Sequence, residues 1–211
     1  MILSNLSEKN LKTGPVEIKE DSLFVQEELR NGHEAALEFL SILNTKLVAS
    51  DGTPHAGTIL SAAAWLTGTS LNQSFQERDK SFPGTIVTPQ DVNREWENLV
   101  YLLEEYNFQR ADIPVGRLVL AAMGAPHSFK PQAEMLFVRS EFQEQYNVVM
   151  KKHGFDSLEG ARVGILLCSI LIQQYSRAGM IDTDAATGLA AQGIFEAATV
   201  VPPALKSETG Y

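Results

Sequence analysis

The sequence has little cysteine and no basic leader. Its single cysteine, Cys168, cannot form a disulfide within the chain, and its neighbours Leu166, Leu167 and Ile170 predict a buried thiol of low reactivity. The N-terminus lacks the basic start and the apolar stretch that a secretory signal needs. We therefore expect a protein of a reducing compartment, the cytoplasm.

Clusters of basic residues and long apolar runs are also missing. The formal net charge is −9, and the 17 lysines and arginines are scattered, with Lys151 and Lys152 as the longest basic run. Such a charge repels phosphate, so neither nucleic acid nor an anionic membrane surface is an expected partner. The best candidate for a membrane span, the uncharged residues 163–176, is shorter than the roughly 18 residues that a span needs, and we interpret it as a buried helix.

Helical patterns fill most of the chain, and no stretch shows the alternation of a β-strand. We predict an all-α fold, a compact bundle of about seven helices with no significant β-sheet. No repeat and no long linker divides the sequence. The expected organisation is a polar lead-in over residues 1–20, one helical domain over residues 21–203 and a tail over residues 204–211.

An apolar stripe marks the first helix. Its members recur at helical spacings: Leu29, Ala36, Leu40, Leu43 and Leu47. Asp21 or Ser22 can cap this helix, which we expect to reach about residue 49. Asn31 followed by Gly32 favours a turn, so a division of the helix at this point is an alternative.

Three later helix starts carry capping signals. Thr53 as N-cap with Pro54 at the first helical position predicts the start of the second helix. Asp156 and Glu159 have the spacing of a capping box, and Asp182 can cap the last helix. Several helix boundaries can therefore be predicted from the local sequence.

The last two helices, residues 157–177 and 183–200, carry few charges. Glycines lie inside these helices and inside the second one: Gly68, Gly164, Gly188 and Gly193. An interior glycine costs about 1 kcal/mol relative to alanine, so close helix contact is expected to offset these residues. Two sources of contact remain open: a central hairpin within one chain, or packing against a second subunit in a homodimer.

The common motifs of metal and cofactor sites are absent from the sequence. None of the 4 histidines has a glutamate three residues before it, and no His-Glu-x-x-His or Gly-rich phosphate loop occurs. His33 next to Glu34 and Glu38 is more simply a solvated helix face. We expect no metal and no cofactor.

One pattern suggests a ligand site. Proline followed by histidine occurs twice at expected loop-to-helix boundaries, at His55 and at His127. The free N–H groups of a helix start favour an anion, and His55 with Thr53 or Thr58 could complete a pocket in which Asp51 orients the imidazole. The alternative is ordinary helix capping with exposed histidines.

Three functions remain open on the sequence alone. The first is self-association or partner binding through the low-charge helices. The second is binding of a small apolar or amphipathic ligand between helices, for which Trp65 is either a platform or an ordinary core residue. The third is an enzyme with a site near Asp51 and His55.

Overall fold

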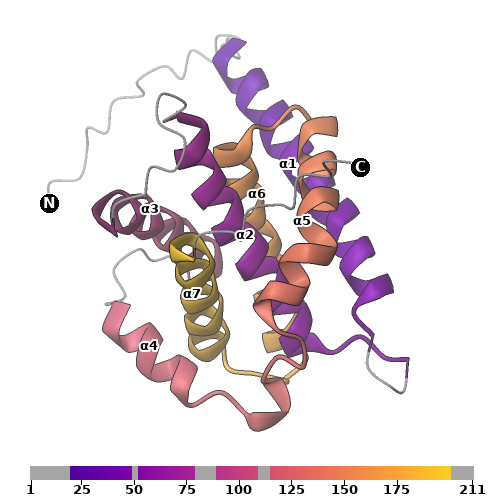
Figure 1. Ribbon diagram of the computed structural model, residues 1–211, viewed down its shortest axis with the longest axis vertical. Helices are drawn as coiled ribbons and strands as arrows, with labels where there is room; N and C mark the ends of the chain where they lie inside the picture. Colours follow the sequence, from indigo (N-terminus) through magenta and orange to yellow (C-terminus); the bar gives the residue numbers. More distant parts are fainter. Residues whose placement is uncertain (1–19, 49–51, 79–88, 109–114, 201–211) are drawn as a thin grey trace, which may run out of the picture.

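The computed structural model describes residues 20–48, 52–78, 89–108 and 115–200, and within them it is all-α (Figure 1). The predicted multi-helix bundle is confirmed. The helices and one short 3₁₀ turn, η1, follow the order α1 (Glu20–Lys46), α2 (Ala56–Arg78), α3 (Pro89–Phe108), α4 (Val115–Met123), η1 (His127–Phe129), α5 (Met135–Lys152), α6 (Ser157–Arg177) and α7 (Thr183–Thr199). Most of the predicted lead-in, the tail and Asp51 lie outside the described residues.

Helix α2 occupies the centre of the bundle (Figure 1). Every residue from 56 to 72 is buried, and this stretch contains no charged side chain. It packs chiefly against α7 and α6, with α5 and η1 along the same helix. A helix that is small and apolar on all sides has no face suited to water, so it becomes the core around which the others assemble.

The glycines allow close helix crossings around α2. A Cβ atom on Gly68 would overlap the carbonyl oxygen of Ile194 in α7, and Gly193 lies against Ala64 of α2. In α6, a Cβ atom on Gly164 would overlap the hydroxyl of Thr67. The close contact that offsets the glycines is thus made within one chain, while the homodimer through residues 157–177 and 183–200 stays a prediction.

Two predicted caps are confirmed. The Asp156 carboxylate accepts a hydrogen bond from the Glu159 N–H at 2.8 Å, and the Glu159 carboxylate accepts one from the Asp156 N–H at 2.9 Å, which completes the capping box of α6. The Asp182 carboxylate accepts from the N–H groups of Asp184 and Ala185 at the start of α7. The starts of α6 and α7 therefore follow from local hydrogen bonding.

One boundary prediction is wrong. Helix α2 begins at Ala56, not at Pro54, because His55 replaces Thr53 as the capping residue.

The first helix is not divided at Asn31 and Gly32, which was the alternative to one continuous helix. Helix α1 continues through Gly32, which is buried beside Val163 and Phe155, so tertiary packing overrides the turn preference of this position.

Side chains from two helices hold the C-terminal end of α7. The Asn72 amide of α2 donates to the Ala198 carbonyl at 2.7 Å, and the Arg139 guanidinium of α5 donates to the Val200 carbonyl at 3.2 Å. A cation is favourable at the negative end of a helix dipole. Among the described residues, no helix is both long and apolar enough to cross a membrane.

Candidate functional site

The predicted site around His55 is a closed hydrogen-bond cluster. The His55 Nδ1 atom lies 3.1 Å from the Thr58 nitrogen and 2.8 Å from the Thr58 hydroxyl. Its Nε2 atom lies 3.0 Å from the carbonyl oxygen of Ser128. Because a carbonyl only accepts, we assign the ring hydrogen to Nε2, which leaves Nδ1 to accept the Thr58 N–H as a helix cap.

This cluster joins the two Pro-His segments of the chain. The Thr58 hydroxyl also accepts a hydrogen bond from the Gln132 N–H at 2.9 Å, so the start of α2 is tied to the segment around η1. Thr58 is buried, with an exposed fraction of 4%. Both ring nitrogens of His55 and the hydroxyl of Thr58 are therefore engaged by the protein itself.

The other predicted site residues that the structure describes are not part of this cluster. The side chains of Thr53 and His127 are exposed, and Asp51 lies outside the described residues. Trp65 is buried in the apolar core beside Gly193, where it packs like other core residues. The ligand site that we predicted near His55 stays a prediction, and the described contacts are those of a helix cap.

Glu38, considered above as a metal ligand, forms an ion-pair cluster. Its carboxylate lies 2.8 Å from the Lys152 ammonium and 2.9 Å from the His153 ring. Hydrogen bonds from Lys152 and then His153 hold the pKa of Glu38 below its ordinary value. No group of three or more potential metal-binding side chains occurs in the described part of the chain.

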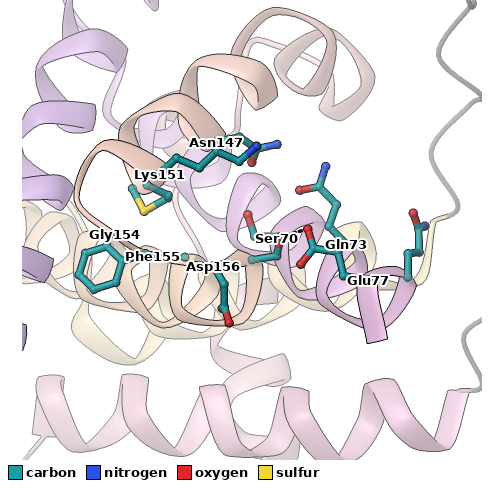
Figure 2. A pocket seen from close by; sticks show the side chains of 12 residues that line it. Ser70, Gln73, Glu77, Asn147, Lys151, Gly154, Phe155 and Asp156 are labelled. Carbon is teal, nitrogen blue, oxygen red and sulfur yellow. Dashed lines mark hydrogen bonds between the residues drawn. The ribbon is translucent and has the colours of Figure 1, made fainter. Parts of the chain in front are cut away.

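A different site lies toward the C-terminal end of α2. An open groove with a volume of about 650 Å³ separates α2 from the end of α5 and the start of α6 (Figure 2). We call it the polar groove, and its lining residues are Ser70, Gln73, Gln76, Glu77, Asn147, Met150, Lys151, Gly154, Phe155, Asp156, Ser157 and Gly160. Pockets for small ligands typically have volumes of roughly 300 to 1,000 Å³.

The local sequence explains why polar groups gather here. Helix α2 changes after Asn72 from small and apolar residues to Gln73, Gln76 and Glu77, where it leaves the core. Helix α5 ends at Lys152, and Gly154 with φ of +85° lets the chain reverse toward the cap of α6. Two helix ends and a turn thereby surround one opening.

The groove has an apolar and hydroxyl-bearing floor and a charged rim. Ser70 and Met150 are buried, with exposed fractions of 1% and 3%, whereas Phe155 is half-buried. Lys151 and Glu77 are exposed at the rim. The lining is therefore amphipathic, with charges near water and apolar atoms below them.

Several polar atoms of the groove have no partner. The Gln143 amide nitrogen donates to the side-chain oxygens of Asn147 at 2.9 Å and Gln73 at 3.4 Å, and the amide nitrogens of those two residues find no acceptor within the described ranges. The Ser70 hydroxyl makes no hydrogen bond to the described residues, and Lys151 forms no ion pair with them. The Gln143 oxygen of the same amide cluster is buried and also has no partner, so both donors and an acceptor beside the groove are unused by the described residues.

Comparison with known proteins adds no identity, since no protein-family model, curated protein or solved structure matches this chain. The assignment of a site depends on geometry alone. Our sequence analysis missed the groove, because its walls come from segments more than 70 residues apart; Ser157, whose hydroxyl donates to Glu77 at 2.7 Å, follows it by 80 positions. The one available signal was the change of α2 from apolar to polar residues.

Proposed function

We propose that the protein binds a small amphipathic molecule in the polar groove. The observation that carries this proposal is the lining of the groove, where Ser70 lies at the floor beside Met150 and its hydroxyl makes no hydrogen bond to the described residues. The Ser70 oxygen is not among the fully enclosed side-chain atoms that lack a partner, so it faces the open groove. A ligand atom could therefore bond to this hydroxyl without breaking a hydrogen bond between described residues.

The rest of the lining supports the same function. A ligand in the groove would contact Met150 and Phe155 with its apolar part, and the amide groups of Gln73 and Asn147 would bond to its polar part. Binding sites of small molecules combine an apolar lining with a few well-placed polar groups. The opening toward water also allows a ligand to enter without unfolding of the bundle.

A blocking substitution tests this proposal. We expect native mass spectrometry of the untagged protein, incubated with the small-molecule fraction of a cell extract, to show a bound mass. Asn147→Trp places an indole over the groove and should abolish that mass. Val148→Trp is the matched control, because Val148 is the next residue and is 60% exposed on α5 without lining the groove. Adducts that persist in Asn147→Trp, or no adduct in any variant, would contradict ligand binding here.

Self-association is the second candidate function. It is favoured by large apolar side chains that remain exposed, namely Phe195 at 37% within the predicted interface, and Leu120 at 71% and Met123 at 80% on α4, which packs against α7. Exposed apolar groups of this kind are common at protein interfaces. The same mass spectra test it, since a homodimer through residues 157–177 and 183–200 requires the mass of two chains.

A further inference from the structure

We propose that the ligand of the polar groove is a small zwitterion, whose carboxylate faces Lys151 and Asn147 and whose ammonium group faces Glu77. This inference rests on the proposed function and names the ligand class for the same groove. In Figure 2, Lys151 and Asn147 lie on one side of Ser70 and Asp156 lies on the other, with Gln73 and Glu77 toward the end of α2.

The α5 side of the groove presents donors. Lys151 is a cation without an ion-pair partner in the described residues, and the Asn147 amide nitrogen has no acceptor there, while the Asn147 oxygen accepts from Gln143. A carboxylate is an acceptor-only group with room for several hydrogen bonds. Bonds between ionised partners are the stronger ones, so a carboxylate fits this side.

The opposite side presents acceptors. One carboxylate oxygen of Glu77 accepts from the Ser157 hydroxyl, and one of Asp156 accepts from the Glu159 N–H, so each acid keeps a second oxygen for another donor. An ammonium group supplies three donors and a compensating charge. These two acids would repel a simple anion, and Lys151 would repel a simple cation. A ligand that carries both charges avoids either conflict.

The groove lining also includes apolar side chains and a hydroxyl. Met150 and Phe155 line the groove, and the Ser70 hydroxyl at its floor makes no hydrogen bond to the described residues. A short hydrocarbon segment between the two ligand charges would contact this apolar part of the lining, while a carboxylate oxygen or an amine hydrogen reaches Ser70. The lining therefore favours an ω-amino acid over a compact dipole or a sugar.

The test uses matched probes in the intact protein at low ionic strength, because exposed charges are screened by salt. The zwitterions are glycine, 4-aminobutyrate and 6-aminohexanoate, and the single-charge probes are hexanoate and hexylamine. Binding is followed through chemical-shift changes of groove amides. We expect one of the longer zwitterions to bind at least about tenfold more tightly than either single-charge probe, since charged hydrogen bonds contribute about 1.5 to 3 kcal/mol.

Two variants assign the ends of the ligand. Lys151→Gln should weaken the zwitterion and hexanoate about tenfold while leaving hexylamine unchanged, and Glu77→Gln should weaken the zwitterion and hexylamine instead. Lys152→Gln is the matched control for Lys151, because Lys152 pairs with Glu38 and does not line the groove.

The outcomes separate this inference from the proposed function. If hexanoate or hexylamine binds as tightly as every zwitterion, or if extract compounds bind while the zwitterions do not, the ligand class is wrong and the groove remains a binding site. If neither the probes nor the extract perturbs the groove, both proposals fail.

Discussion

The two ends of α2 differ in whether their buried polar side chains have hydrogen-bond partners. At the N-terminal end, His55 and Thr58 have all their main hydrogen-bonding atoms engaged by the chain, through Ser128 and Gln132. Toward the C-terminal end, Ser70 is as buried as Thr58 but has no partner in the described residues. The comparison teaches that a buried polar residue is a ligand candidate when its bonding capacity is left over and it also lines an opening, which the buried hydroxyls of Ser176 and Thr187 do not.

The same distinction separates histidine from serine as site candidates. A histidine at a helix start is an obvious site candidate because its chemistry is versatile. The ring nitrogens of His55, however, bond to the Thr58 N–H as a helix cap and to the Ser128 carbonyl. Ser70 has less versatile chemistry, and its place in the sequence gives no reason to select it. Its surroundings make it the better candidate, because its hydroxyl lines the groove and makes no hydrogen bond to the described residues.

The largest effect is expected where α2 crosses α7 closely, because both ends of α2 depend on this packing. Gly68→Ala places a methyl group against the backbone carbonyl of Ile194, which cannot rotate away as a side chain could. We expect a loss of about 3 kcal/mol in unfolding free energy, at the upper end for overpacking, measured by urea denaturation. Gly124→Ala is the control, since its Cβ would lie 3.4 Å from the Ala121 carbonyl at an exposed position. Equal stability of the two variants would contradict the close α2 and α7 crossing.

A second substitution breaks the N-terminal end alone. Thr58→Val keeps the side-chain shape but removes the hydroxyl that contacts His55 and accepts from Gln132, so we expect a loss of about 1 to 2 kcal/mol. Thr69→Val should cost less, because the Thr69 hydroxyl bonds only to the Trp65 carbonyl of its own helix. Probe binding in the groove should be unchanged in Thr58→Val. A weaker probe affinity would mean that the two ends are coupled.

A smaller effect is expected from the ion pairs of Glu38, which involve Lys152 and His153. Glu38→Gln should reduce stability by about 0.5 kcal/mol at neutral pH, because it removes the exposed pairs with Lys152 and His153. Since the folded pKa of Glu38 is held below the ordinary value of 4.5, its contribution is present above that value and disappears as the pH falls through the folded pKa. Urea titrations between neutral and acidic pH should show the variant and the wild type converging. A difference that grows on acidification would reverse the sign of this interpretation.

The smallest effect is expected at the groove itself. Ser70→Ala should leave the unfolding free energy unchanged or slightly raised, by up to about 0.5 kcal/mol, because no hydrogen bond within the described residues is lost. Ser74→Ala, one turn later, should destabilise the protein, since the buried Ser74 hydroxyl donates to the Leu71 carbonyl at 2.7 Å. Differential scanning fluorimetry compares the two. Clear destabilisation by Ser70→Ala would show that the hydroxyl has a structural partner.

Local chemistry made part of the fold predictable. The Asp156 capping box and the Asp182 cap were readable because each needs only residues within a few positions. The start of α2 was misread because the preference of Thr53 and Pro54 for a helix start competes with an imidazole that reaches Thr58 and Ser128 at once. A bond across 73 positions does not appear in any local pattern.

The groove was unpredictable for the same reason. Gln73, Asn147 and Asp156 are ordinary surface residues in their own segments, and their proximity depends on how α5 and α6 pack against the end of α2. The Ser70 hydroxyl is equally ordinary in sequence. It is distinguished by its place in the groove, where its hydroxyl makes no hydrogen bond to the described residues.

By itself, the sequence determined the helical class, the starts of α6 and α7 and the need for close glycine contacts, because periodicity, capping and the missing Cβ atom act over short range. The tertiary structure alone decided that α2 is the central helix, that Gly68 and Gly164 face partners in the same chain, and that unused donors collect around Ser70. Those properties depend on which segments meet, and many distant contacts set that arrangement together.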